Sequence, residues 1–361
     1  MKFKNIFLIL ALSLAFTACN NSNDMANNDN KVTSDENATK VNDKEEKSTI
    51  YASFYPIYNL TKQIAGDKFE VKSFTNLKTE SHDWEPSAKD MAEVSKAKLM
   101  FINGAGMEEW EDSLKNSTDI ELVNTSKDIE LIKASEEDDH DHDHENEDTD
   151  HDHDHEHEDA DHDEDQDHDE DHDHEDANED EHHHHHGEYD PHLWLSPKNA
   201  ISQAKVIAEK LSEIDPANKD YYMDNFKKIE EELKALIAEY KDKFDGCENK
   251  NFLVNHKAFS YLAKDFSLNQ IALTSLTSTE ETDAKTLKDA SLKAKELNIK
   301  TIFYEMGSSD KNAKTLADEI GADTKPLNTL ELATDENIKN DTTYQELVRE
   351  NLEAIYQSLV K

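Results

Sequence analysis

Three histidines stand apart from the other histidines of the chain. His82 lies in "TESHDWEPS", His192 in "YDPHLWLSP" and His256 directly after "FLVN". Each falls between a predicted strand and a predicted helix, and open parallel sheets bind ligands beyond the carboxyl ends of their strands. Three imidazoles with a carboxylate suit Zn²⁺, whereas a Mn²⁺ site is expected to use more oxygen ligands. We therefore expect the three side chains to converge on one metal site in a cleft.

The remaining histidines lie in a second, very different metal-binding pattern. Between residues 136 and 188 the chain has 16 of its 19 histidines, about 30 acidic residues and no Lys or Arg. The segment closes with the run His182, His183, His184, His185 and His186. Alternating His and Asp offers many overlapping ligand sets without one geometry, so we expect weak, accessory metal binding that acid weakens. Such a composition cannot build a core, which predicts a disordered insertion at 134–188.

The formal charge of the chain excludes one class of partner. It is −44 at pH 7, and most of the excess comes from the histidine-rich segment. A chain this acidic repels phosphate backbones, so we expect no nucleic-acid partner.

The N-terminus has the pattern of an export signal. Two lysines precede an apolar run and small residues, which predicts a signal peptide at 1–18. The following Cys19 suggests lipid attachment, and the polar residues 19–47 read as a flexible tether to the bacterial membrane. Phe16 occupies the place where lipoprotein signals prefer leucine, so an ordinary secretory signal is the alternative. Either reading places the protein outside the cytoplasm.

The elements that must position the histidines alternate regularly. Strands and helices follow one another over short loops in residues 48–215 and again in 247–361, which predicts two similar α/β lobes with parallel sheets. Before the helix that starts near Pro197, Ser196 is the expected N-cap.

Between the lobes, residues 216–246 predict one long helix. Its apolar positions recur in steps of three and four and form one stripe: Tyr222, Phe226, Ile229, Leu233, Leu236, Tyr240 and Phe244. A helix of about 29 residues within this range would span about 43 Å at 1.5 Å per residue, enough for a rigid connector between two lobes.

These motifs together resemble the zinc- and manganese-specific solute-binding lipoproteins of bacterial ABC importers. "ASFYPIYNLTKQIAGDKFEV" is similar to the family's opening strand and helix, and "SHDWEPS", "DPHLWLSP" and "NHKAFSYLAKDF" resemble its first three ligand motifs. "INGAGMEEW" resembles a family turn, and "IFYEMGSSDKNAKTLADEIG" followed by "PLNTLE" resembles the region of the fourth ligand. The resemblance covers residues 48–361 without the insertion.

The resemblance implies a ligand set. His82, His192 and His256 match the family's three imidazole ligands, and His256 favours the zinc branch because manganese members have a carboxylate there. Glu331 matches the fourth ligand, although Thr329 stands where the family often has proline. Glu305 is the rival, read as an outer or lobe-packing carboxylate.

Several residues near the three histidines are expected to have supporting roles rather than to bind the metal. Asp190 and Glu85 are candidate acceptors for the histidine N–H groups. Trp84, Trp110 and Trp194 flank the motifs and are expected to pack between the lobes.

The implied function is a non-catalytic, high-affinity Zn²⁺ receptor. It would act as a monomer, carry Zn²⁺ as cargo in the interlobe cleft, and deliver it to an ABC permease with its ATPase. The alternatives are a manganese receptor of the same family, a metal-dependent surface adhesin, and a zinc hydrolase with three protein ligands and a water.

Overall fold

The computed structural model describes residues 47–78, 81–82, 84–134, 188–274 and 284–361. The expected signal peptide, Cys19, nearly all of the tether and the run from His182 to His186 lie outside these residues. Among the helices of the described part, none combines the length and apolar composition that crossing a bilayer requires.

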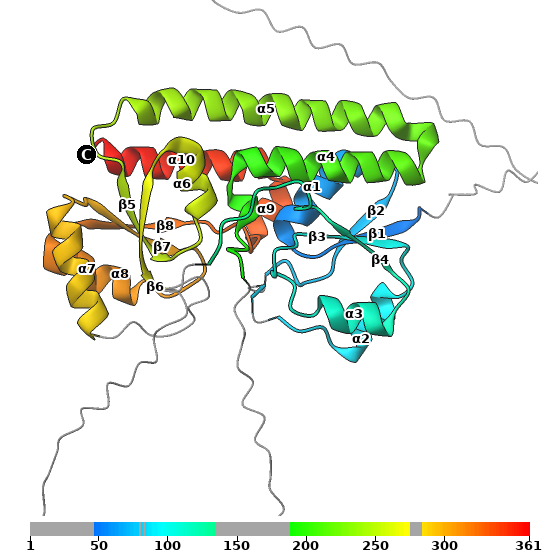
Figure 1. Ribbon diagram of the computed structural model, residues 1–361, viewed down its shortest axis with the longest axis horizontal. Helices are drawn as coiled ribbons and strands as arrows, with labels where there is room; N and C mark the ends of the chain where they lie inside the picture. Colours follow the sequence, from blue (N-terminus) through cyan, green and yellow to red (C-terminus); the bar gives the residue numbers. More distant parts are fainter. Residues whose placement is uncertain (1–46, 79–80, 83, 135–187, 275–283) are drawn as a thin grey trace, which may run out of the picture. The chain divides into compact units, whose positions relative to one another are not determined.

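Two four-stranded parallel sheets organise the chain (Figure 1). The first has the order β2-β1-β3-β4, with β1 (Thr49–Ala52), β2 (Glu70–Ser73), β3 (Leu99–Ile102) and β4 (Glu121–Asn124). The second has the order β6-β5-β7-β8, with β5 (Asn251–His256), β6 (Asn269–Thr274), β7 (Thr301–Glu305) and β8 (Asp323–Leu327). The two orders are equivalent, which confirms the prediction of two similar parallel-sheet lobes.

Helices connect and cover these strands. They are α1 (Tyr55–Ala65), α2 (Ala88–Val94), α3 (Glu111–Ser117), α4 (Pro197–Ile214), α5 (Lys219–Asp245), α6 (Ser260–Phe266), α7 (Ala284–Glu296), α8 (Lys311–Ile320), α9 (Asp335–Asn340) and α10 (Tyr344–Leu359). The Ser196 side chain caps α4 by accepting from the Asn199 backbone N–H, as predicted. Two helices follow β8: α9 ends where Asp341 adopts the left-handed conformation (φ 52°), and α10 begins at a capping box on Thr343.

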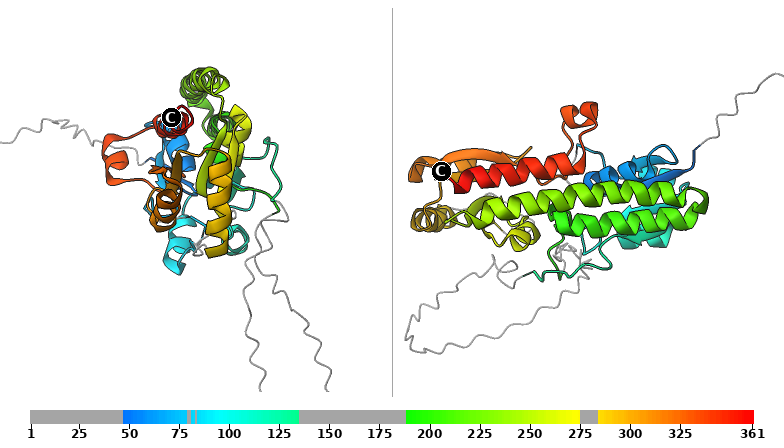
Figure 2. Two further views of the ribbon diagram at one scale, coloured as in Figure 1. Left: turned by 90° about the vertical axis from the view of Figure 1, so that its left-hand side faces the viewer. Right: turned by 90° about the horizontal axis from the view of Figure 1, so that it is seen from above.

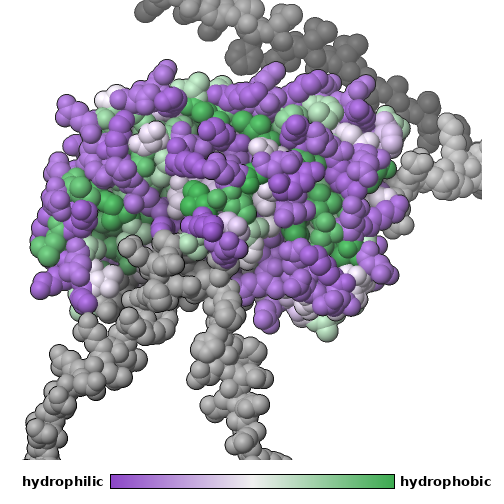
Figure 3. Space-filling model, in the orientation of Figure 1, coloured by the Kyte–Doolittle hydropathy of each residue, from purple (hydrophilic) through white to green (hydrophobic). Residues whose placement is uncertain are grey.

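The long helix α5 is the confirmed link between the lobes. It begins at Lys219 because Pro216–Asn218 form a separate 3₁₀ turn. All seven residues of the predicted stripe are buried, and α5 packs against α4, α1 and α10 (Figures 1 and 2). On the face of the molecule that Figure 3 shows, the outer side of α5 is largely hydrophilic, as expected for a helix that buries one stripe.

Alternation along the strands divides the core. Ile50 and Phe101 of the first sheet, and Phe252 and Phe303 of the second, belong to one buried cluster that also contains the α5 stripe. Their strand neighbours face the opposite sides of the sheets and form two separate outer clusters. The shared inner cluster ties both sheets to the same long helix, so the carboxyl ends of their strands are held on a common scaffold.

Candidate metal centre

The four residues expected as ligands lie beyond the carboxyl ends of strands. His256 is the last residue of β5, and His82 lies in the loop after β2. His192 precedes the 3₁₀ turn that leads into α4. Glu331 lies in the loop after β8, directly after Leu330, whose φ of 61° turns the chain sharply. The candidate ligands thus come from both lobes.

Three of these side chains already have nearly the spacing of a metal site. His82, His192 and Glu331 each offer a ligand atom, and these atoms all lie within 4.8 Å of one another. His82 Nε2 is 3.1 Å from His192 Nε2 and 3.6 Å from Glu331 Oε1. A tetrahedral Zn²⁺ with bonds of 2.0–2.1 Å holds neighbouring donor atoms about 3.4 Å apart. These two separations therefore bracket the edge of a zinc tetrahedron.

His256 lies beside this group rather than inside it. Its ring centroid is 5.4 Å from that of His192, and its side chain is nearly buried. Its Nδ1 pairs with Glu305 Oε2 at 3.1 Å, which leaves Nε2 as the nitrogen for a metal. His256 is therefore the candidate for a third imidazole beside this group, and it lies outside the group of three as the structure stands.

Asp190 orients His192. Its Oδ1 accepts the His192 backbone N–H at 3.0 Å and lies 2.8 Å from ring Nδ1. An acceptor at Nδ1 selects the neutral tautomer with its lone pair on Nε2, the atom that faces His82. Burial lowers the pKa of His192, more than the Asp190 partner raises it. The ring is therefore held neutral, the form that binds a metal.

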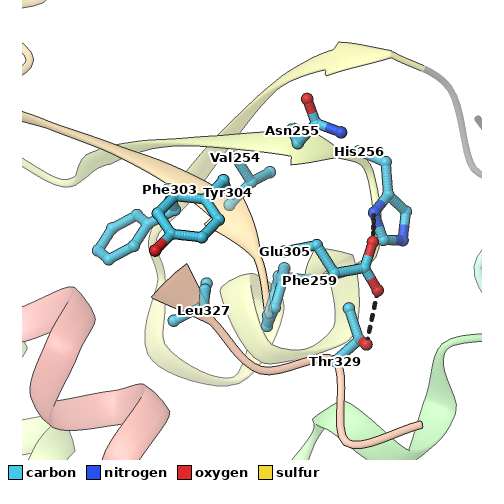
Figure 4. A pocket seen from close by; sticks show the side chains of 9 residues that line it. All are labelled: Val254, Asn255, His256, Phe259, Phe303, Tyr304, Glu305, Leu327 and Thr329. Carbon is cyan, nitrogen blue, oxygen red and sulfur yellow. Dashed lines mark hydrogen bonds and ion pairs between the residues drawn. The ribbon is translucent and has the colours of Figure 1, made fainter. Parts of the chain in front are cut away.

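Glu305 performs the same task for His256. Figure 4 shows its carboxylate pointing at both the His256 ring and the Thr329 hydroxyl, which donates at 2.8 Å. Desolvation raises the pKa of Glu305, but the contacts to His256 and Thr329 outweigh it and leave the pKa lowered. The cavity beside these residues holds about 10 Å³, on the scale of one water-sized sphere. Both oxygens of Glu305 thus have partners outside the group of three.

Glu331 has the opposite character. It is 1% exposed, and its Oε2 accepts the Ser81 backbone N–H at 3.2 Å. Its Oε1 is buried without a hydrogen-bond partner among the described residues. Desolvation, and then the nearby Glu305 charge, raise the pKa of Glu331 to about 7. A buried carboxylate with an unsatisfied oxygen next to two imidazoles is suited to a cation.

The tryptophans divide between two roles. Trp194 lies between the lobes as expected: it is fully buried, its ring is 4.8 Å from Phe54, and its Nε1 donates to the Thr329 carbonyl at 2.7 Å. The expectation for Trp84 and Trp110 was wrong. Both pack on Phe74 in the outer cluster of the first sheet, because that face needs large apolar side chains of its own.

Sequence reasoning identified some orienting residues and missed others. Of the two candidate acceptors, Asp190 contacts a histidine, while Glu85 is exposed. Asn103 was missed: its amide donates to the Pro191 carbonyl at 2.9 Å, directly before His192. Only its place in the "INGAGMEEW" turn could have pointed to it, because no local pattern reveals a contact across 88 residues.

Comparison with known proteins places this geometry in a context. Residues 50–358 match the family model described as zinc-uptake complex component A, periplasmic. The high-affinity zinc uptake system protein ZnuA of Bacillus subtilis (strain 168) is 34% identical over 362 residues, covering 99% of this chain and 98% of that protein. The zinc-binding lipoprotein AdcA of Streptococcus pneumoniae serotype 4 is 33% identical over 317 residues. That match covers 86% of this chain and 56% of AdcA.

Solved structures agree with the fold. The Zn(II)-bound ZnuA-like domain of Streptococcus pneumoniae AdcA has a TM-score of 0.66 at 28% identity, covering 88% of this chain and 100% of that one. The laminin-binding protein Lmb of Streptococcus agalactiae, described as a bifunctional adhesin and metal transporter, has a TM-score of 0.68 at 29% identity. It covers 86% of this chain and 99% of its own.

Proposed function

We propose, on the premise that the chain belongs to the zinc-uptake complex component A family, that it is a zinc receptor for an ABC importer. It captures Zn²⁺ outside the cytoplasm, beyond the carboxyl ends of the strands of both sheets. It then releases the ion to a membrane permease that an ATPase drives. Zn²⁺ is the cargo of this cycle, and the protein performs no chemistry on it.

One observation carries the proposal. His82 Nε2 lies 3.1 Å from His192 Nε2 and 3.6 Å from Glu331 Oε1, close to the edge of a zinc tetrahedron, and this Glu331 oxygen has no hydrogen-bond partner among the described residues. His256, aimed by Glu305, is the proposed third imidazole. This donor set, rich in imidazole, favours Zn²⁺ over Mn²⁺. The names of the relatives also favour zinc, and they do not favour adhesion as the main role.

A fourth protein ligand separates a receptor from a hydrolase. Catalytic zinc sites keep one position open for water, whereas closed four-ligand sites hold the ion itself. Glu331 fills that position in the proposed site. The carboxylate therefore supports transport over hydrolysis.

We also propose attachment of the protein to the outer surface of the membrane through lipid on Cys19. The lipid anchor is supported by the signal pattern before this residue and by the lipoprotein name of AdcA. Incorporation of labelled palmitate, lost in Cys19→Ser, tests it.

The receptor function is tested by metal content and by competition. Purified full-length protein is expected to contain Zn²⁺ and to bind it more tightly than Mn²⁺, and removing the protein should slow growth only when zinc is scarce. A preference for Mn²⁺ in the purified protein would contradict the choice of metal. Zinc-limited growth that does not depend on the protein would contradict the transport role.

The two carboxylates are expected to differ in effect. Glu331→Gln removes a charged ligand and should weaken Zn²⁺ binding by more than about 100-fold. Glu305→Gln should weaken it by about 10- to 100-fold, as is usual when a residue that hydrogen-bonds to a metal ligand is replaced. Competition titration with a chromophoric chelator measures both. If Glu305→Gln has the larger effect, the roles of the two residues are reversed.

Zinc affinity should fall in acid. Because the pKa of Glu331 is raised to about 7, the carboxylate is increasingly protonated below that pH, and Zn²⁺ must displace the proton. Affinity should drop up to about tenfold per pH unit for each proton displaced below pH 7, and flatten above it. In Glu331→Gln one proton fewer is displaced, so Zn²⁺ affinity should fall less steeply with decreasing pH, by about tenfold per pH unit. An affinity that stays constant between pH 6 and 8 would contradict the raised pKa.

A further inference from the structure

A short antiparallel ribbon closes the base of the insertion directly before His192. It consists of one isolated β-bridge between Lys133 and Tyr189, whose two sides are joined by backbone hydrogen bonds from Ala134 N to Glu188 O (3.0 Å) and from Asp190 N to Ile132 O (2.9 Å). The inner end of the ribbon is Asp190, the residue whose carboxylate holds the His192 ring. The position of the ribbon therefore sets the position of this histidine.

One hydroxyl from the second lobe holds both strands of this ribbon. Tyr261 lies on α6 and is 3% exposed. Its hydroxyl donates to the Asp190 carbonyl at 2.8 Å and accepts the Ile132 backbone N–H at 2.9 Å. Burial raises the pKa of Tyr261 well above its usual range, so the hydroxyl stays a donor at any working pH. The buried Asp190 carbonyl needs such a partner.

The same helix is connected to the opposite side of the metal centre. α6 begins four residues after His256, the last residue of β5. Tyr261 thus links the segment that carries His256 to the segment that carries His192, through Asp190. The rings of these two histidines are 5.4 Å apart between centroids. A displacement of the ribbon would change that spacing without touching either ring.

We propose that Tyr261 is a positioning residue for the metal centre, whose hydroxyl sets the spacing of His192 relative to His256 through Asp190. This inference rests on the proposed zinc-binding function. Held at the right spacing, the imidazoles fit a tetrahedral ion with bonds of 2.0–2.1 Å. Released, they accommodate ions of other geometry, so the hydroxyl contributes to the choice of metal as well as to affinity.

The test compares full-length wild type with Tyr261→Phe, which keeps the ring and removes only the hydroxyl. Zn²⁺ affinity should fall by about 10- to 100-fold, and the ratio of Zn²⁺ to Mn²⁺ affinity should narrow. The visible spectrum of the Co²⁺-loaded protein should change, because its intensity depends on tetrahedral geometry. Tyr222→Phe is the matched control: it loses a buried tyrosine hydroxyl that donates to Asp215 at 2.6 Å, and it should leave affinity and spectrum unchanged.

A double-mutant cycle separates positioning from a general loss of stability. If Tyr261 acts through Asp190, the loss in Tyr261→Phe with Asp190→Asn should be smaller than the product of the single losses. When Tyr261→Phe is combined with Glu305→Gln, which acts on His256, the two losses of Zn²⁺ affinity should multiply.

Three results would overturn the inference. The first is that Tyr261→Phe binds Zn²⁺ as tightly as the wild type. The second is that the loss of Zn²⁺ affinity in the double variant of Tyr261→Phe and Asp190→Asn equals the product of the two single losses. The third result applies if Tyr261→Phe folds poorly, and it uses Asp190→Asn alone, which keeps the backbone carbonyl. An unaltered Co²⁺ spectrum in that variant would contradict the inference. A wild-type protein that binds no Zn²⁺ would instead refute the proposed function, and is distinguished by its own titration.

Discussion

Replacing His192 with alanine is expected to abolish tight zinc binding, with a loss of affinity of more than about 100-fold, beyond the effect of an outer partner. The ring is completely buried and lies next to both His82 and His256. Its removal takes away a ligand and leaves Asp190 oriented toward a void. Isothermal titration in competition with a chelator measures the loss, and circular dichroism verifies the fold.

The control for this variant is removal of the histidine-rich segment. Ala134 and Glu188 are joined by a backbone hydrogen bond, so residues 135–187 can be replaced by Asn-Gly, a two-residue turn that suits an antiparallel ribbon. This variant should keep one tight Zn²⁺ site and lose weak additional binding. If it loses all tight zinc while His192→Ala keeps it, the interlobe site is wrong.

Replacing Trp194 with alanine should have the largest effect on stability. The side chain is fully buried and packs edge-to-face on Phe54, and large-to-small changes of this kind cost about 3–5 kcal/mol. Its Nε1 also holds the Thr329 carbonyl, two residues before Glu331. Both the free energy of unfolding and the zinc affinity should therefore fall, as urea denaturation and metal titration would measure.

Trp194→Phe distinguishes the two contributions. It keeps most of the apolar contact with Phe54 but cannot donate to Thr329, so it should lose less stability than the alanine variant while still weakening zinc binding. Trp110→Phe is the matched control, because Trp110 packs on Phe74 in the outer cluster of the first sheet. Equal zinc affinities in Trp194→Phe and wild type would show that the Thr329 contact does not hold the Glu331 loop.

Local patterns in the sequence were enough to predict most of the secondary structure and to identify the three candidate histidine ligands. The stripe from Tyr222 to Phe244 is a property of helical periodicity alone, and every one of its residues is buried. Likewise, His82, His192 and His256 could be selected because each follows or precedes a regular element in a chain whose other histidines lie in one segment.

Tertiary structure alone decided which side chains surround the candidate metal centre. Glu305 and Glu331 are both acidic residues near the ends of neighbouring strands. Only the fold gives both oxygens of Glu305 close partners and leaves Glu331 with a buried oxygen that has no hydrogen-bond partner among the described residues. The contact between Tyr261 and Asp190 joins residues 71 apart. Such contacts depend on how two lobes pack on a shared helix, a free energy summed over many distant side chains. The spacing of residues along the chain therefore does not predict these contacts.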